Sequence, residues 1–280
     1  MLKIAIPNKG ILADSAFSML KEAGYATRRD TAELHVVDEP NQIEFFYLRP
    51  RDIATYVGEG SLDAGLTGLD LLKDARSKAI EIADLGFGES LFRFATTEQS
   101  SIKSVNDLTG KRIATAYANL LSDYLAQKSI KASVVKLDGA VESAIKLGVA
   151  DVIADVVSTG NTLRKAGLQA FGDPILRSTA RLIAAPGKEK LTEKLLRRLQ
   201  GVIVAREYVL IDYDCPKNLV DKAVVITPGI ESPTISPLAD QDWVAVRALV
   251  KAAKTNQIMD ELYEIGARAI LVTEIHAARI

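Results

Sequence analysis

The chain has 280 residues, of which 48% are hydrophobic, and its 35 basic and 36 acidic side chains leave a formal net charge of −1. This composition is typical of a folded globular protein with two or three lobes, and it excludes an intrinsically disordered chain. The balanced charge, with no basic run, makes nucleic acid an unexpected partner. No apolar run approaches the roughly 18 residues of a membrane helix, so we expect no membrane association.

Cysteine and histidine are scarce in this sequence. Cys215 is the single cysteine, and His35 and His276 are the two histidines. One cysteine cannot form a disulfide within the chain, and no charged leader precedes the apolar run that starts at Leu2. We therefore expect a cytoplasmic protein without a secretory signal. Two histidines also exclude a metal site built from a histidine cluster.

Short β-branched runs alternate with helical patterns through the first 180 residues. Such alternation predicts βαβ units around mostly parallel sheets. The predicted strands are 3–6, 43–48, 64–67, 80–84, 112–115, 133–137 and 152–155, and the predicted helices are 13–23, 52–57, 120–127 and 140–146. Ligands of such sheets bind where the carboxyl ends of strands enter helices. The loops at these positions are therefore the candidate site.

The pattern changes in the last third of the chain. Leu191, Leu195 and Leu199 recur at helical spacing and predict one long helix at 189–205. The elements predicted after it are a strand at 208–212, a helix at 216–222, strands at 234–236 and 243–250, a helix at 256–265 and a strand at 269–273. This βαββαβ order matches the ferredoxin-like plan. We therefore expect a domain boundary near residue 209.

The strongest local signal is residues 151–163, which read DVIADVVSTGNTL. An apolar strand ends at Asp155, and a turn of small residues at 158–162 then opens a helix. Small side chains let a phosphate approach several backbone N–H groups, and the helix N-terminus adds partial positive charge. Asp155 is placed to accept hydrogen bonds from ribose hydroxyls. An ordinary capped helix uses the same residue types, so the turn alone leaves both interpretations open.

Two further loops carry basic side chains. Lys9 and Gly10 follow the first strand, and Arg49 and Arg51 flank the start of the helix after strand 43–48. Cations at the carboxyl ends of strands can meet an anion, and two arginines can clamp phosphate oxygens. Taken singly, side chains of this kind are more commonly exposed surface residues.

Three more strand-to-helix turns add acids, glycines and an aromatic residue. Gly65 and Gly68 would let a ligand approach the backbone closely, and Asp70 follows them. Tyr117 lies in the turn after strand 112–115, and Glu142 is expected in the first turn of helix 140–146. Each residue has a plain structural alternative, in the core or on the surface. Together the loops suit a ligand with several phosphates and a sugar.

Ordered motifs run through nearly the whole chain. They are PNKG at 7–10, LRPRDIATYVGEGSLDAGLTGLD at 48–70, RIATAYANL at 112–120, LDGAVE at 137–142, DVIADVVSTGNTL at 151–163, DYDCP at 212–216, TPGIESPTISPL at 227–238 and WVAVRALV at 243–250. This series resembles the long form of the ATP phosphoribosyltransferase family, which starts histidine biosynthesis. Ala118 and Asn161 depart from the pattern, since relatives often carry proline and arginine there.

The resemblance implies an α/β fold with a two-lobed catalytic region like that of type II periplasmic binding proteins. Lobe I would comprise 1–92 with 181–208, lobe II 93–180, and a C-terminal ferredoxin-like regulatory domain 209–280. The implied reaction transfers phosphoribosyl from phosphoribosyl diphosphate to N1 of the ATP adenine and releases pyrophosphate, with Mg²⁺ as cofactor. The resemblance also implies a homo-oligomer that moves between dimers and hexamers, and inhibition by L-histidine.

The resemblance also implies roles for individual residues. The catalytic residues would be Lys9, Arg49 and Asp155, and the substrate-binding residues Gly10, Asp70, Tyr117, Glu142, Ser158, Thr159, Gly160, Asn161 and Thr162. The turn at 158–162 would hold the 5-phosphate. L-Histidine would contact Asp214, Ile230, Ser232, Thr234, Leu249 and Ala269. No protein ligand is assigned to Mg²⁺, which substrate phosphates would largely hold.

Two other functions use the same features. A solute-binding module could share the cleft fold without any chemistry, but the expected lack of an export signal and the double set of phosphate-handling loops speak against it. A catalytically silent regulatory subunit could sense an amino acid through the C-terminal domain. The retained Asp155 and the full STGNT turn argue against that second alternative.

Overall fold

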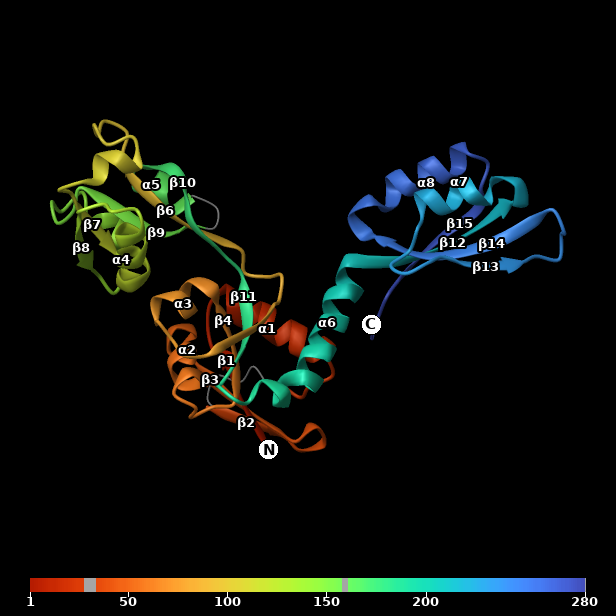
Figure 1. Cartoon of the computed structure of the whole chain (residues 1–280), viewed down its shortest axis with the longest axis horizontal. Helices are drawn as coiled ribbons and strands as arrows, with labels where there is room; N and C mark the ends of the chain where they lie inside the picture. The colour runs from red at the N-terminus through yellow and green to blue at the C-terminus, as the bar shows by residue number, and fades with distance from the viewer. Residues whose placement is uncertain (28–33, 158–160, 280) are drawn as a thin grey trace. The chain divides into compact units, whose positions relative to one another are not determined.

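The computed structural model describes residues 1–27, 34–157 and 161–279. The chain divides into two compact units, residues 1–196 and 197–280. The first unit contains two β-sheets and the second contains one (Figure 1).

The first sheet of unit one has six strands in the order β2-β3-β1-β4-β11-β5. Its strands are β1 (Leu2–Pro7), β2 (His35–Asp38), β3 (Ile43–Leu48), β4 (Ala64–Gly68), β5 (Ile80–Asp84) and β11 (Ala180–Ala184), and its helices are α1 (Ile11–Glu22), α2 (Pro50–Gly58) and α3 (Leu69–Asp74), with η1 (Glu39–Asn41). Strand β1 pairs in parallel with both β3 and β4. Buried apolar residues such as Ala5, Ile53 and Val57 pack α2 against this sheet.

The second sheet of unit one has five strands in the order β10-β6-β9-β7-β8. Its strands are β6 (Ser90–Thr97), β7 (Arg112–Thr115), β8 (Ser133–Lys136), β9 (Val152–Val157) and β10 (Leu168–Ser178), with α4 (Ala118–Gln127), α5 (Asn161–Lys165), η2 (Val105–Leu108) and η3 (Val141–Ser143). The chain leaves the first sheet after β5 and returns at β11, with only Thr179 between β10 and β11.

The predicted strands of the first 180 residues are all present, with ends that differ by no more than two residues. The expectation of mostly parallel sheets is wrong, because β2, β5, β6, β10 and β11 pair antiparallel with their neighbours. Strand β10 was not predicted, since Gly172 and Pro174 interrupt its pattern and its register with β6 shifts between Phe171 and Leu176. Strands β2, β6 and β11 and helix α3 were also not predicted.

The helix expected at 140–146 is wrong in extent. Only the short 3-10 helix η3 (Val141–Ser143) forms there. Ala140 before it has a left-handed backbone with φ 48°, which ends any regular helix on that side. Glu142 consequently lies in a single tight turn and not on the face of a longer helix.

Unit two has a four-stranded antiparallel sheet in the order β13-β14-β12-β15. The strands are β12 (Tyr208–Pro216), β13 (Thr234–Pro237), β14 (Trp243–Lys251) and β15 (Arg268–Glu274), with η5 (Lys217–Leu219), α7 (Val220–Ile226), η6 (Ala252–Lys254) and α8 (Thr255–Glu264). Both α7 and α8 cover one face of the sheet (Figure 1). Alternate residues of β12, including Ile211 and Tyr213, are buried beneath them. The βαββαβ order expected from the sequence is confirmed.

Helix α6 (Glu193–Glu207), preceded by η4 (Glu189–Thr192), contains the division between the two units. The sequence suggested a boundary near residue 209, where β12 begins, whereas the compact units divide between Leu196 and Arg197. The contact of Gly201 with the end of the chain explains the difference. A Cβ atom on Gly201 would lie 2.1 Å from the carbonyl oxygen of Ala278, so this part of α6 packs within unit two.

Gly65 provides a test of how closely β4 packs against α2. A Cβ atom there would lie 2.6 Å from Cγ2 of Ile53 and 3.1 Å from Cγ2 of Val57. This glycine therefore makes room for the core and not for a ligand. We expect Gly65→Ala to lower the free energy of unfolding by about 1–3 kcal/mol, measured by urea titration.

Gly139→Ala is the matched control for this substitution. A Cβ atom on Gly139 meets nothing within 4 Å, and its φ is not left-handed, so we expect little change in stability. Equal stability of the two variants would contradict the packing role of Gly65.

Candidate functional site

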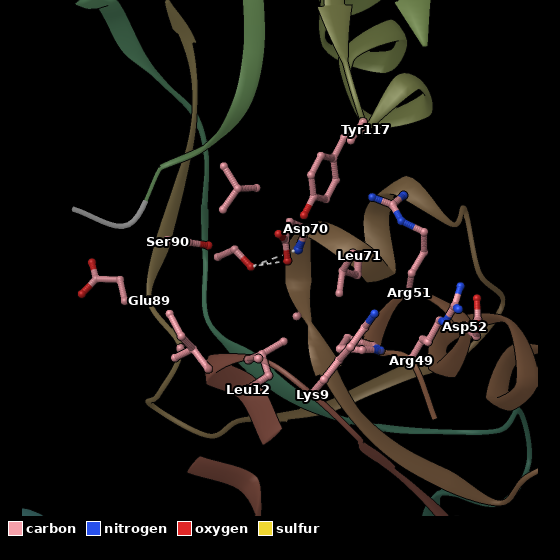
Figure 2. Close-up of a pocket in the computed structure, with 18 of the residues that line it drawn as sticks. Lys9, Leu12, Arg49, Arg51, Asp52, Asp70, Leu71, Glu89, Ser90 and Tyr117 are labelled. Carbon is pink, nitrogen blue, oxygen red and sulfur yellow. Dashed lines mark hydrogen bonds between the residues drawn. The ribbon is translucent and has the colours of Figure 1, made fainter. Parts of the chain in front are cut away.

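A cavity of about 850 Å³ in unit one is lined by loops of both sheets (Figure 2). Most of its residues follow the carboxyl ends of β1, β3, β4, β7 and β8, where the sequence placed the candidate loops. The lining residues used below are Lys9, Gly10, Arg49, Arg51, Asp70, Tyr117, Val156 and Ser178.

Three cationic side chains line the same cavity. Strand β1 pairs in parallel with β3, and Pro7 lies opposite Leu48, so the loops that carry Lys9 and Arg49 leave the sheet side by side. Arg51 follows in the first turn of α2. Figure 2 shows these side chains together on one side of the cavity. This arrangement favours an anionic ligand with more than one phosphate.

Asp70 is held in the cavity wall by a serine from a distant strand. The carboxyl group is buried, and its Oδ1 accepts a hydrogen bond of 2.8 Å from the Ser178 hydroxyl. The Asp70 N–H donates to the Ser178 Oγ at 3.0 Å. A Cβ atom on Gly68 would lie 2.3 Å from Asp70 Oδ1, so only glycine leaves room for the carboxylate in this position.

Tyr117 faces Asp70 across the cavity. Its hydroxyl points toward the Asp70 carboxylate in Figure 2. Burial, and then the negative charge of Asp70, raise the pKa of Tyr117 well above its usual range. The guanidinium carbon of Arg51 lies 4.7 Å from the centre of the Tyr117 ring. Tyr117 is therefore a protonated hydrogen-bond donor that stacks beneath a cation.

Asp155 and Glu142 are not among the described residues that line the cavity, although Val156, the neighbour of Asp155, is. Burial raises the pKa of Asp155 to about 6, against the lowering effect of the Val156 N–H, which donates to its Oδ1 at 2.8 Å. The charge of Glu142 raises this pKa further, and Arg51 lowers it. Asp155 is therefore close enough to Glu142 and to Arg51 of the cavity wall for their charges to act on its carboxyl group.

The structure thus places five of the predicted substrate or catalytic residues around one cavity: Lys9, Gly10, Arg49, Asp70 and Tyr117. Ser158, Thr159 and Gly160 lie outside the described residues. Asn161 and Thr162 begin α5, so the phosphate-binding turn stays a prediction. Ser178 was not predicted, because 108 residues separate it from Asp70 and no local pattern links them.

The residues predicted to bind L-histidine lie in unit two. Asp214, Leu249 and Thr234 belong to β12, β14 and β13, on the sheet face opposite the buried residues of β12 and β14. Ile230 and Ser232 belong to the loop before β13. Ala269 lies where the register between β12 and β15 shifts, beside Asp214, and has a left-handed φ of 51°. Their role as one binding site stays a prediction.

Among the described residues, no group of three or more His, Cys, Asp or Glu side chains is arranged to hold a metal ion. None of the described helices has the length and apolar character needed to span a bilayer.

Comparison with known proteins extends these observations. The sequence model of ATP phosphoribosyltransferase matches residues 49–201, and that of the HisG C-terminal domain matches residues 205–277. ATP phosphoribosyltransferase of Paenarthrobacter aurescens (strain TC1) is 60% identical over the full length of both chains. In a structure of the ATP phosphoribosyl transferase (HisG:HisZ) complex from Thermotoga maritima, a chain 29% identical matches with a TM-score of 0.62, covering 72% of this chain and 98% of that one.

The fold of unit one also occurs outside this group of enzymes. A structure of Tv2483 bound to L-arginine matches with a TM-score of 0.51 at 11% identity, covering 71% of this chain and 83% of that one. This likeness concerns the fold alone, and it agrees with the two-lobed architecture of type II periplasmic binding proteins. With a family model that covers more than half of the chain and a full-length relative at 60% identity, this chain belongs to the ATP phosphoribosyltransferase family.

Proposed function

We propose that the cavity in unit one is the site at which this chain transfers phosphoribosyl from phosphoribosyl diphosphate to N1 of the ATP adenine. The observation that carries the proposal is the convergence of Lys9, Arg49 and Arg51 with the buried Asp70–Ser178 pair and the protonated Tyr117 in one cavity. Membership of the ATP phosphoribosyltransferase family supports it.

The proposed chemistry requires binding and charge stabilisation more than proton transfer. Adenine N1 has a free lone pair near pH 7, so it can attack C1 of the ribose without first losing a proton. The C1–N1 bond forms while the bond from C1 to the diphosphate oxygen breaks. Lys9, Arg49 and Arg51 would stabilise the negative charge that gathers on the leaving pyrophosphate.

The acids would act on the ribose. Asp155, with Glu142 beside it, would accept hydrogen bonds from the ribose hydroxyls, and its negative charge would favour positive charge developing at C1. The turn at 158–162 would hold the 5-phosphate at the N-terminus of α5. By holding the ribose in a fixed orientation, these groups would lower the activation free energy of the transfer by roughly several kcal/mol.

Mg²⁺ is the proposed cofactor. No three acids of the described residues are grouped to hold the ion, so the oxygen ligands that Mg²⁺ prefers would come largely from the substrate phosphates, which Lys9, Arg49 and Arg51 could hold in the cavity. Bound mainly by the substrate phosphates, the ion would neutralise part of the charge on the leaving group.

Unit two would regulate the reaction that takes place in unit one. We propose that L-histidine binds at the sheet face of unit two and inhibits the reaction, in a cytoplasmic homo-oligomer that moves between dimers and hexamers. The Thermotoga maritima structure pairs HisG with HisZ. The match of residues 205–277 to the HisG C-terminal domain supports a chain that carries its own regulatory domain and needs no activator partner.

A direct assay tests the proposed function. The full-length chain is mixed with ATP, phosphoribosyl diphosphate and Mg²⁺, with pyrophosphatase present to remove one product. We expect N1-alkylated adenine to accumulate, detected by the change in its ultraviolet spectrum and by mass. Lack of product from folded protein under these conditions would reject the enzyme, and binding without turnover would favour a solute-binding or regulatory role.

Asp155→Asn should change turnover and stability in opposite directions. Turnover should fall strongly, because the charge facing C1 is lost. Folding raises the pKa of Asp155 from the ordinary value of 3.8 to about 6, so the folded state binds the proton more tightly than the unfolded state. The stability that this proton contributes is fully present below about pH 4 and is lost as the pH rises through 6. Well above pH 6 the variant should therefore be more stable than the wild type by up to about 3 kcal/mol, the free energy that corresponds to a pKa raised from 3.8 to about 6, and the difference should vanish below about pH 4.

Urea titrations between pH 4 and pH 8 measure this effect. Asp173→Asn, at an exposed acid of β10, is the control and should show no such pH-dependent difference. A wild-type rate in Asp155→Asn would remove Asp155 from the proposed catalytic group, and equal pH profiles would contradict its raised pKa.

Asp214→Asn tests the proposed histidine site in the full-length chain. A neutral amide cannot form an ion pair with the ligand's amine or imidazolium, so we expect the concentration of L-histidine for half-inhibition to rise roughly tenfold. Activity without L-histidine should stay near that of the wild type. Asp221→Asn, at an exposed acid in the first turn of α7, is the control. Unchanged inhibition in Asp214→Asn would place the histidine site elsewhere.

A further inference from the structure

Asp74, the last residue of α3, joins the two sheets of unit one through both oxygens of its carboxylate. Its Oδ2 lies 2.6 Å from Nη1 of Arg51. Its Oδ1 accepts hydrogen bonds from the backbone N–H groups of Asn119 and Leu120, at 3.0 and 3.2 Å. The side-chain amide of Asn119 also donates to the Asp74 backbone oxygen, at 2.8 Å. The residue is buried, so these contacts are shielded from water.

The contact with Asn119 and Leu120 supplies an N-cap from outside the helix. The N-cap position of α4 is occupied by Tyr117, which makes no side-chain capping hydrogen bond. The first N–H groups of a helix need an acceptor, which normally comes from a Ser, Thr, Asp or Asn at that position. Asp74 provides it from α3, and the side chain of Tyr117 is left to line the cavity.

The contact with Arg51 fixes the cation that lies over Tyr117. An acid at the C-terminal end of α3 opposes the helix dipole, so its position there needs compensating partners. Arg51 and the N-terminus of α4 are those partners. Arg51 in turn lies 4.7 Å from the centre of the Tyr117 ring and lines the cavity with Lys9 and Arg49.

We propose that Asp74 is a positioning residue that couples the capping of α4 to the placement of Arg51 over Tyr117, and thereby sets the affinity of the cavity for the diphosphate group. Asp74 acts through Arg51 and does not itself contact the ligand. The proposal rests on the proposed function for its kinetic consequence, and on the contacts of Asp74 alone for its effect on diphosphate binding.

A neighbouring ion pair provides the matched control. Arg76 and Asp123 also join the segment after α3 to α4, but both side chains are 55% exposed and neither lines the cavity. If Asp74 served only to connect α3 to α4, its substitution would have the same effect on diphosphate binding as that of Asp123. If Asp74 also positions Arg51, its substitution should have the larger effect, because Asp74 contacts both Arg51 and α4 whereas Asp123 pairs with Arg76.

The experiment measures binding of magnesium pyrophosphate by calorimetry, and kcat and KM for both substrates. The full-length variants are Asp74→Asn, Asp123→Asn, Arg51→Gln and the double variant Asp74→Asn/Arg51→Gln. Asparagine is itself a good N-cap, so Asp74→Asn should keep the cap of α4 and a Tm close to that of the wild type. It should lose the ion pair with Arg51.

We expect Asp74→Asn to weaken pyrophosphate binding roughly tenfold, and to raise KM more than it lowers kcat, because a displaced Arg51 loses ground-state binding. Asp123→Asn should bind pyrophosphate within about twofold of the wild type, as exposed ion pairs contribute little. The double variant should bind no more weakly than Arg51→Gln, since both substitutions remove one interaction.

Three results would overturn the proposal. They are wild-type pyrophosphate affinity in Asp74→Asn, an equal loss in Asp123→Asn, and losses in the two single variants that multiply in the double variant. Failure of the proposed function is recognised separately, as a wild-type chain that binds pyrophosphate and forms no N1-alkylated adenine.

Discussion

The parallel pairing of β1 with β3 and β4 is the constraint on which the cavity depends. Because Pro7 lies opposite Leu48, and Ile4 opposite Ala64, the three strands end at the same edge of the sheet. The loops that follow them therefore present their cations, glycines and acids to one region. Repacking of any of these strands would separate the cations from Asp70. The absence of a side chain at Gly65 lets α2 pack closely against this part of the sheet.

Local patterns were enough to predict the elements that form this edge. Strand β3 has the bounds expected from its apolar run, β1 and β4 differ from the expected bounds by no more than one residue at either end, and the basic loops follow β1 and β3 as expected. The C-terminal unit was also predictable, since the alternation of buried and exposed residues along β12 and β14 has a period of two. In both cases the information lies within a few consecutive residues, where sequence patterns are informative.

The contacts that complete the site depend on residues far apart in the chain. Ser178 meets Asp70 across 108 residues, and Asp74 meets Asn119 across 45. Neither pair has a local pattern, because each forms only when the chain returns from the second sheet or packs α3 against α4. The helix expected at 140–146 is reduced to η3, and the left-handed backbone of Ala140 explains its later start but not its end at Ser143. The phosphate turn at 158–160 lies outside the described residues, so its prediction rests on sequence alone.

The junction between β10 and β11 limits how the two sheets of unit one can move. Thr179 is the only residue between these strands, and a single residue adds about 3.5 Å of chain at most. Its carbonyl accepts the N–H of Leu69, and its hydroxyl donates to Asp84. The sheets therefore cannot slide apart at this point, and a rotation that opened the cavity would pass through the backbone of Thr179 and through residues 85–89, which connect β5 to β6. Ser178 is the neighbour of Thr179. A rotation at Thr179 would therefore first change the hydrogen bonds between Ser178 and Asp70.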